Sequence, residues 1–359
     1  MAIFTDIFED VTKQGRKIPT SDYHEIGAHP IIDQGQSAIA GYMDETDGLF
    51  TDVPAIIFGD HTRVLKYVDT PCFLGADGVK LLKAKIANSN HKYLYYVLSN
   101  ANIPNTGYNR HFKWLKEVDI PLPNADEQQK IVDTLDKVSE LIALRKEQLT
   151  KLDQLVKSRF IELFGKCKEH KRLAEYAPLI TKGASPKWQG VDYCEEGTLF
   201  VTSENVREGY LDLSKKKYLD DKINEIQPRS ILKRNDILIN IVGASIGRAA
   251  VYDCDEVANI NQAVALVRVD YSQINQTYLM TFLNSPQAIE MYGKMKKGGA
   301  RDNLSLQNIA DLQIPVAPIE LQNQFALFVE QTDKSKLAIQ QSLDKLETLK
   351  KSLMQEYFG

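Results

Sequence analysis

The chain has 359 residues, 43% of them hydrophobic and 26% charged, which is typical of a soluble globular protein of one to three domains. Its start has no cationic segment and no apolar core, and no run of about 18 apolar residues exists, so we expect neither a signal peptide nor a membrane span. The formal net charge of −4 argues against a protein that is basic throughout, although local basic loops remain compatible with it.

The cysteines indicate a reducing environment. Cys72, Cys167, Cys194 and Cys254 lie far apart, which excludes a CxxC metal knuckle. Reduced thiols in the cytoplasm are the simplest interpretation.

The first segment, residues 1–119, is predicted to be a globular domain of strands and helices. Apolar runs at 54–59 and 78–82 are bounded by Gly, Asp and Asn, as strands often are. Pro121 and Pro123 then end an extended stretch and permit a helix to begin.

Residues 120–165 are predicted to form one long helix with a coiled-coil seam. Seam positions recur with alternating spacings of 4 and 3 from Ile131 to Leu163, and Gly165 stands where a helix-capping glycine belongs. At about 1.5 Å per residue, this helix would be on the order of 55–60 Å long. Its candidates for helix pairing are Leu135, Ile142, Leu149 and Leu152.

Residues 166–313 are predicted to form a second globular domain, with strand-like runs at 236–243 and 263–270. Residues 314–359 follow as a second long helix, which Pro315 and Pro318 precede. The candidates for pairing in this helix are Val329, Ile339, Leu343 and Leu346.

The two helical segments are copies of each other. Residues 120–165 align without a gap to residues 314–359, from the Ile-Pro pair at the start to the Phe-Gly pair at the end. The polar interruptions of the two seams do not coincide, since Lys336 aligns with Ile142. We therefore expect the two unlike seams to pair with each other, antiparallel and within one chain. A helical pair that serves only as a spacer is the alternative.

The globular segments match each other only loosely. Tyr93 and Leu94 resemble Tyr278 and Leu279 in their order before the helix, but most of the two segments differs. Unlike globular parts on like helices are typical of two modules that recognise different targets on one common frame.

The entry to each helix resembles a motif of type I restriction enzyme specificity subunits. Residues 120–128 and 314–322 are similar to that family's sequence of Ile-Pro, a hydrophobic residue, prolines and then Glu-Gln. Residues 233–247 resemble its stretch of Asp-Ile-Leu followed by a Gly-rich turn, and residues 55–60 keep an outline of the same stretch. The resemblance covers nearly the whole chain.

This resemblance implies an α+β fold with an internal pseudo-two-fold repeat. Two mixed α/β target-recognition domains would be separated by two long antiparallel coiled-coil helices. Each domain would read one half of a split, asymmetric site in double-stranded DNA, and the helices would fix the gap between the halves.

The resemblance also implies partners and their cofactors. Two modification subunits would bind S-adenosylmethionine and methylate adenine, and two restriction subunits, which are motor-nucleases, would use ATP and magnesium. The chain itself is then expected to bind no cofactor and no metal, to be non-catalytic, and to have no membrane partner.

Polar and basic residues on the predicted loops are the candidates for DNA contact, because base edges are read by polar side chains while phosphate contacts set the position. The candidates in the first domain are His61, Thr62, Arg63, Tyr108, Asn109 and Arg110. Those in the second domain are Lys182, Lys187, Trp188, Asn205, Ser245, Arg248, Lys294, Lys296, Lys297 and Arg301. The alternatives are solvated turns, a helix cap at Asn109 and a packed Trp188.

The sequence contains no recognised catalytic motif. An adenine methyltransferase run of Asp or Asn, two prolines and an aromatic residue is missing, as are a phosphate-binding P-loop and an HExxH zinc motif. Glu169 and Lys171 imitate a nuclease motif but lie in a polar linker. A scaffold with two protein-binding modules and no DNA is the alternative function, and an autonomous nuclease is disfavoured because the carboxylates that it needs are missing.

Overall fold

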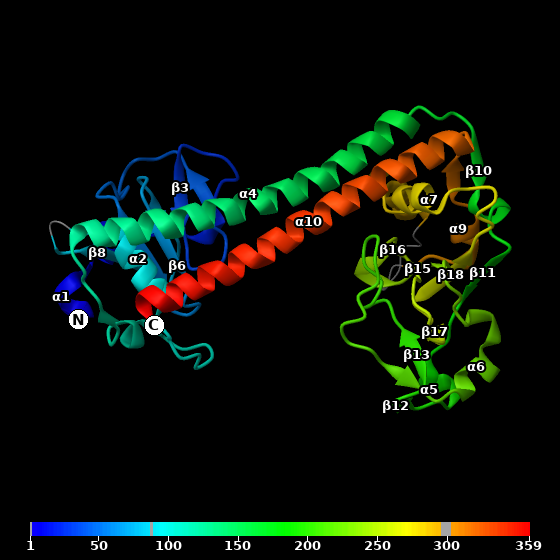
Figure 1. Ribbon diagram of the computed structural model, residues 1–359, viewed down its shortest axis with the longest axis horizontal. Helices are drawn as coiled ribbons and strands as arrows, with labels where there is room; N and C mark the ends of the chain where they lie inside the picture. The colour runs from blue at the N-terminus through cyan, green and yellow to red at the C-terminus, as the bar shows by residue number, and fades with distance from the viewer. Residues whose placement is uncertain (1, 87–88, 296–302) are drawn as a thin grey trace. The chain divides into compact units, whose positions relative to one another are not determined.

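A computed structural model describes residues 2–86, 89–295 and 303–359, and the chain divides into two compact units (Figure 1). The first unit comprises residues 1–147 and 340–359, and the second comprises residues 148–339. Two long helices, α4 (Ala125–Phe164) and α10 (Ile319–Phe358), each begin in one unit and end in the other. Among the described residues, no helix has the length and apolarity to cross a membrane.

The described residues of the first unit form two sheets of three or four strands, one two-stranded sheet and three short helices. Its strands are β1 (Ala2–Ile3), β2 (Phe8–Asp10), β3 (His29–Ile32), β4 (Gly41–Met43), β5 (Ala55–Gly59), β6 (Leu65–Val68), β7 (Phe73–Leu74), β8 (Val79–Ala84) and β9 (Asp119–Ile120). Its short helices are α1 (Phe4–Ile7), α2 (His91–Asn100) and α3 (Phe112–Leu115), with 3-10 turns at Thr12–Gln14 and Thr20–Asp22. The larger sheet is antiparallel in the order β2-β8-β5-β6, and the smaller has the order β4-β3-β7, in which β3 and β7 are parallel.

The second unit repeats this plan with more residues. Its strands are β10 (His170–Arg172), β11 (Leu179–Lys182), β12 (Tyr193–Cys194), β13 (Thr198–Val201), β14 (Tyr218–Leu219), β15 (Ile237–Asn240), β16 (Ala249–Val251), β17 (Ala258–Ile260), β18 (Val264–Arg268) and β19 (Gln313–Pro315). Its short helices are α5 (Pro186–Gln189), α6 (Lys222–Ile226), α7 (Gln276–Leu283), α8 (Pro286–Met295) and α9 (Leu306–Ala310), with 3-10 turns at Leu173–Glu175, Pro228–Ser230 and Gly243–Ser245. One four-stranded sheet is antiparallel in the order β11-β18-β15-β16, and a second four-stranded sheet has the order β12-β14-β13-β17, in which β13 and β17 are parallel.

The two units therefore share one topology. In each, an antiparallel four-stranded sheet accompanies a second sheet with one parallel pair. A short strand at the start of each globular part pairs with the strand that precedes a long helix, β1 with β9 and β10 with β19. The predicted α+β fold with an internal repeat is confirmed, and the repeat extends from the helices into the sheets.

The predicted heptad seam is confirmed. In residues 141–158 of α4, the positions that are not exposed are those of the predicted seam, namely Ile142, Arg145, Leu149, Leu152 and Val156. In α10 the predicted residues Val329, Ile339, Leu343 and Leu346 are likewise buried or half-buried. The charged face of each helix stays in water while the stripe of seam residues is covered.

The long helices are antiparallel within each unit, as predicted. In the first unit Leu135, near the start of α4, shares a core with Leu353, near the end of α10. In the second unit the ring of Phe160, near the end of α4, lies 5.4 Å from that of Phe325, near the start of α10.

Two seam lysines show how the polar interruptions are accommodated. Lys336 Nζ lies 2.7 Å from Asp153 Oδ1 on the other helix. The pKa of the Lys350 amine is lowered because the amine is partly buried, and the nearby Asp136 carboxylate offsets part of this effect. Both interruptions thus place a carboxylate of α4 close to a lysine of α10.

A buried glutamine at the start of each long helix attaches that helix to a short helix of the same unit. Gln128 Oε1 accepts from the Asn90 N–H (3.3 Å), and Gln322 Oε1 accepts from the Asn275 N–H (2.9 Å). The side-chain oxygens of these asparagines cap α2 and α7. Each glutamine also donates to a carbonyl of the turn before its helix, at 2.9 and 2.8 Å.

A tyrosine in each short helix connects the two long helices. The Tyr93 hydroxyl donates to the Pro121 carbonyl (3.0 Å), before α4, and its ring lies 5.6 Å from that of Phe358, at the end of α10. The Tyr278 hydroxyl donates to the Pro315 carbonyl (2.7 Å), at the end of β19, and its ring lies 4.6 Å from that of Phe164, at the end of α4. Each unit thereby holds the start of one long helix and the end of the other.

Two details of the helix ends differ from the prediction. The helices begin at Ala125 and Ile319, because the preceding Ile-Pro pairs contribute to strands β9 and β19 and to the turns after them. Gly165 directly follows the last residue of α4, as predicted, but it lacks the left-handed backbone that a capping glycine usually has. Gly165 is not among the positive-φ residues, and its N–H donates to the Ile161 carbonyl (2.8 Å), which continues the helical pattern.

We expect Gln322→Leu to lower the free energy of unfolding by about 2–4 kcal/mol, because it leaves the half-buried Asn275 N–H and the buried Ala317 carbonyl without partners. Urea denaturation measures the change. Gln324→Leu, on the exposed face of the same helix, is the matched control and should have little effect. Equal effects of the two substitutions would contradict the role of the buried amide.

Candidate nucleic-acid interface

Three loops of the first unit meet and form what we call loop cluster 1, residues 33–37, 60–64 and 101–111. The Thr62 hydroxyl donates to the Gln34 carbonyl (2.6 Å), and the His111 N–H donates to the Asp60 carbonyl (2.8 Å). Loop cluster 1 contains all the DNA-contact candidates predicted in the first domain, so the structure brings them together. Gln34, which joins two of the loops, was missed by the sequence analysis because the strand before it, β3, was not predicted.

Asp60 and His111 form the buried base of loop cluster 1. Asp60 is 5% exposed and His111 is fully buried. Asp60 Oδ1 accepts from the Phe112 N–H (2.8 Å), and its carbonyl oxygen lies 2.9 Å from His111 Nδ1. These two residues position the loops and are unavailable to a ligand, although they directly adjoin predicted contact residues in the sequence.

The rim of loop cluster 1 is exposed. Tyr108 is 88% exposed, and its ring stacks on the His61 imidazole with centroids 4.6 Å apart and planes at 8°. Asn109 and Arg110 are also exposed. The alternative role of Asn109 as a cap is wrong, because its amide donates to the Thr106 carbonyl while His111 occupies the N-cap position of α3.

Arg63 holds two of these loops together. Its backbone has φ +62°, a left-handed conformation that is uncommon for a residue with a side chain. Its guanidinium donates to the Ile103 carbonyl (3.2 Å), at the start of the loop that carries Tyr108. Arg63 is thus a positioning residue as well as a cation near the rim.

The segment that carries Tyr108 is locally basic although the whole chain is acidic. Residues 101–116 include Arg110, Lys113 and Lys116 but no Asp or Glu. Such a segment attracts an anionic polymer at short range, since screening limits the effect of distant acidic residues to about 10 Å at 0.1 M salt.

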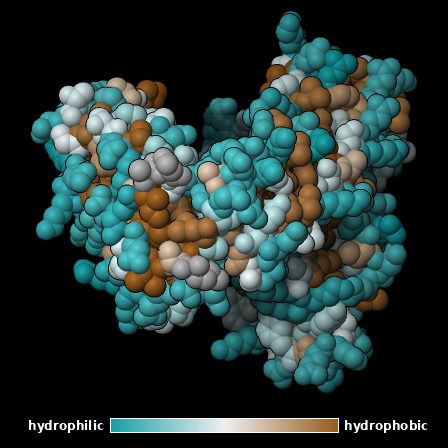
Figure 2. Space-filling view, turned by 60° about the vertical axis from the view of Figure 1, so that its left-hand side comes forward, coloured by the Kyte–Doolittle hydropathy of each residue, from teal (hydrophilic) through white to brown (hydrophobic). Residues whose placement is uncertain are grey.

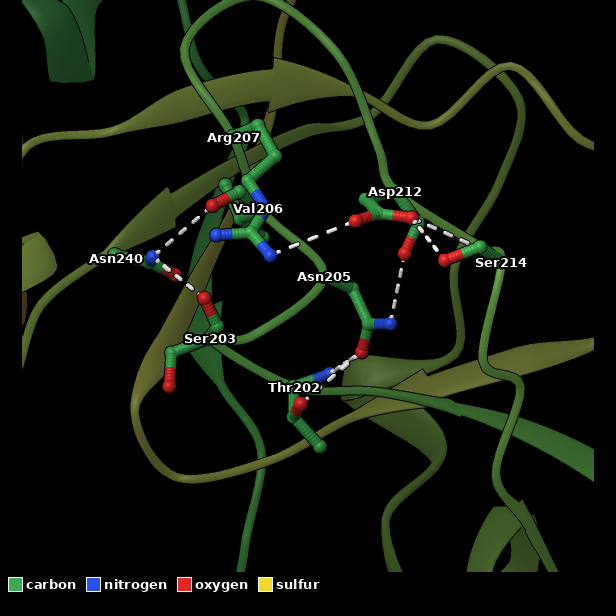
Figure 3. A network of polar contacts seen from close by, with 8 residues as sticks. All are labelled: Thr202, Ser203, Asn205, Val206, Arg207, Asp212, Ser214 and Asn240. Atoms are coloured by element: carbon green, nitrogen blue, oxygen red, sulfur yellow. Dashed lines mark hydrogen bonds and ion pairs between the residues drawn. The ribbon is translucent and has the colours of Figure 1, made fainter. Parts of the chain in front are cut away.

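In the second unit, residues 202–214 and 241–248 form the corresponding loop cluster 2 (Figure 3). Asn240, at the end of β15, is fully buried and joins the two loops. Its amide donates to the Ser203 carbonyl (2.9 Å) and to the Ser245 hydroxyl (3.1 Å). Asn240 was missed by the sequence analysis because it lies in a predicted strand, where a polar residue gives no sign of its partner.

The structure gives Asn205 a structural role rather than the predicted one in base reading. It is 9% exposed, its carbonyl oxygen accepts from the Thr202 N–H (2.9 Å), and its amide donates to the Asp212 carbonyl (3.0 Å). Arg207, which was not predicted, is half-exposed and lies 3.5 Å from Asp212 Oδ2. In the view of Figure 3 its guanidinium lies between Asn240 and Asp212.

The other candidates of the second unit are dispersed. Lys182 ends β11, while Lys187 and Trp188 lie on α5. Among the described residues, no hydrogen bond, ion pair or ring contact joins these three to the Asn240 network. Trp188 is 84% exposed, so the alternative of a packed tryptophan is wrong.

The remaining candidates have varied positions. Arg248 is exposed beside β16, and Lys294 of α8 pairs with Glu290 (2.6 Å). The predicted phosphate contacts Lys296, Lys297 and Arg301 lie outside the described residues.

The part of the chain that the structure describes contains no candidate metal site. There, no group of three or more His, Cys, Asp or Glu side chains is placed to hold a metal ion. Burial raises the pKa of the Cys72 thiol to about 11, so this thiol is protonated and a poor nucleophile.

Known proteins share this duplicated arrangement. The family model of the type I restriction modification DNA specificity domain matches residues 4–154 and again residues 168–350. The specificity subunit of the type I restriction enzyme EcoR124I/EcoR124II from Escherichia coli is 23% identical over 339 residues, covering 88% of this chain and 82% of that protein.

Solved structures show the same fold at low sequence identity. The S subunit of a type I restriction-modification system from M. genitalium has a TM-score of 0.60 at 17% identity, covering 100% of this chain and 95% of that one. A chain from a structure of the complex assembly and conformational transition of a type I R-M system has a TM-score of 0.58 at 17% identity, covering 87% and 83%. Since the family model matches once in each half of the repeat and covers most of the sequence, this chain belongs to the family of type I restriction-modification DNA specificity proteins.

Proposed function

We propose that the chain is the specificity subunit of a type I restriction-modification enzyme and that each loop cluster reads one half of a bipartite, asymmetric DNA site. The observation that carries the proposal is the contrast between the two units. The same Gln, Asn and Tyr contacts fix the helices in both, whereas the loops at corresponding strand ends differ in length and side chains. A repeated frame with unlike loops suits the recognition of two unlike half-sites.

The chemistry of loop cluster 1 supports DNA as the ligand. Its rim presents an aromatic ring, an amide and cationic groups, the side-chain types that contact bases and phosphates. The recognition of a duplex depends on groups of this kind placed on a rigid base, which Asp60 and His111 provide here.

Partner subunits are proposed to bind the long helices and to supply the chemistry. The faces of these helices outside the seam carry exposed leucines, namely Leu141, Leu144, Leu155, Leu337 and Leu349. Figure 2 shows apolar side chains gathered among hydrophilic ones on the visible surface. The modification subunits would bind S-adenosylmethionine and methylate adenine, the restriction subunits would use ATP and magnesium, and this chain would contribute no catalytic residue.

A groove in the second unit is suited to such a partner. It has a volume of about 640 Å³ and lies between the end of α4, the short helix α7 and the start of α10. The groove is lined by apolar side chains, among them Val156, Phe160, Met280 and Val329, and by charged ones that include Lys157 and Lys336. An apolar segment of a modification subunit would bury this surface.

A scaffold that does not bind DNA is not favoured, because the chain belongs to a family of DNA specificity proteins. Electrophoretic retardation distinguishes the two functions. The chain co-purified with its modification subunits should retard duplexes that contain its site in the presence of excess random duplex, whereas a scaffold would retard none selectively.

We expect Arg110→Ala to weaken DNA binding by the assembled methyltransferase at all sequences, because Arg110 is an exposed cation on the rim of loop cluster 1. The slope of log K against log salt should become shallower by about 1. Lys166→Ala, which removes one exposed charge beyond the end of α4, is the matched control and should leave the slope unchanged. An unchanged slope for Arg110→Ala would contradict phosphate contact at this residue.

A graft of a foreign recognition segment between Gly165 and Ile314 should change one half of the methylated sequence and leave the other half as it was. The donor segment should carry Asn and Tyr at the positions of Asn275 and Tyr278, since these residues attach the segment to both long helices. Sequencing of methylated adenines reads out both halves. A graft that changes both halves would contradict independent reading by the two units.

A further inference from the structure

Tyr108 is an exposed aromatic ring with a fixed orientation. Its ring is 88% exposed, yet it lies parallel to the His61 imidazole at 4.6 Å. Gly107 has φ +77°, and the Asn109 amide donates to the Thr106 carbonyl, so both neighbours of Tyr108 belong to a tight turn. One face of the ring is therefore supported by His61, and the ring is presented to whatever binds loop cluster 1.

Arg63 helps to hold the Tyr108 ring in this orientation, although its own backbone conformation is strained. Comparison of the two hairpins identifies its counterpart, because the Arg63 N–H donates to the Gly59 carbonyl (2.7 Å) as the Gly247 N–H donates to the Asn240 carbonyl (2.9 Å). Both positions have a left-handed backbone, with φ +62° and +89°. The second unit places glycine there, which accepts this conformation without strain, whereas the first places arginine.

The side chain of Arg63 accounts for this choice. Its guanidinium donates to the Ile103 carbonyl (3.2 Å) and so attaches the loop of Tyr108 to the hairpin that carries His61. Strained residues that persist in a fold cluster where geometry matters for function. Arg63 thus helps to position the loop that carries Tyr108.

The charge of the segment that carries the ring favours a nucleic acid as its ligand. Residues 101–116 contain Arg110, Lys113 and Lys116 and no acidic residue. A basic segment that also presents an aromatic ring combines attraction for phosphates with a surface on which a base can stack.

We propose that Tyr108 stacks on a nucleobase of the half-site read by the first unit, and that His61 and Arg63 are the positioning residues for this contact. The inference rests on the proposed function and adds to it one specific residue and one mode of contact. Stacking on a side chain requires the base to lose part of its stacking on a neighbouring base, so the contact also distorts the duplex locally.

The test uses the full chain assembled with its modification subunits and duplexes with 2-aminopurine placed in turn at each adenine of the half-site. For the unaltered complex we expect one position, other than the adenine that the modification subunit flips for methylation, at which fluorescence rises on binding. Tyr108→Leu should abolish this rise and weaken binding to the specific duplex roughly 10-fold, within the range for loss of one stacked base. Because no phosphate contact is lost, the salt slope should not change.

Matched variants separate stacking from other roles. Tyr108→Phe keeps the ring and should retain both the fluorescence rise and the affinity. Trp188→Leu removes an equally exposed aromatic side chain from the second unit and should leave the fluorescence in the first half-site unchanged. Arg63→Gly should weaken specific binding and reduce the fluorescence rise without lowering the thermal midpoint of unfolding, because glycine relieves the backbone strain.

The results that would overturn the inference are distinct from those that would overturn the proposed function. If Tyr108→Leu binds and fluoresces like the unaltered complex, or if Tyr108→Phe fails as Tyr108→Leu does, Tyr108 is not a stacking residue, and specific DNA binding by the complex still stands. If Arg63→Gly lowers the thermal midpoint and leaves binding unchanged, Arg63 has only a structural role. If the unaltered complex prefers no duplex sequence, the proposed function itself is wrong.

Discussion

The structure depends on one repeated constraint, the attachment of both long helices to a short helix of each unit. In the second unit, Tyr278 donates to the carbonyl that precedes α10 and packs its ring on Phe164, where α4 ends. Tyr93 does the same in the first unit with the helices exchanged. Because Gln128 and Gln322 add buried hydrogen bonds at the helix starts, the helices cannot slide along each other without leaving buried polar groups unpaired.

This constraint leaves the loops free to differ. The attachments lie at the helix ends, while the loop clusters lie at the ends of sheet strands. In the first unit, loop cluster 1 follows β5 and is fixed by Asp60 and His111. In the second, loop cluster 2 follows β15 and is fixed by Asn240. A change of loop sequence therefore alters the recognition surface without disturbing the helical frame, which is what a family of DNA specificity proteins requires.

Features that depend on local pattern could be predicted from the sequence. The seam was predicted from the alternating spacings of 4 and 3. The pairing of the two helices with each other was predicted because their polar interruptions do not coincide, as where Lys336 aligns with Ile142 in the repeat. The contact candidates of the first domain also lie together, because each stood in a short polar loop after a strand or helix.

Features that depend on distant partners could not be predicted. The sequence around Asn205 is typical of an exposed loop, but the side chain of Asn205 hydrogen-bonds to Thr202 and Asp212 and so stabilises the loop. The Asn240 amide donates to the carbonyl of Ser203, which is distant in the sequence. Neither the burial of Asn240 nor this partner can be recognised from the neighbouring residues. A packed Trp188 was the alternative to DNA contact, because most tryptophans are largely buried, yet its short helix leaves it in solvent.

Selection from a pool of random duplexes by the chain assembled with its modification subunits tests the central claim most directly. Two unlike loop clusters on one fixed frame predict that the bound duplexes share two short, different sequence blocks separated by a gap of constant length and free sequence. A single continuous block, two identical blocks, or no shared sequence would contradict the account.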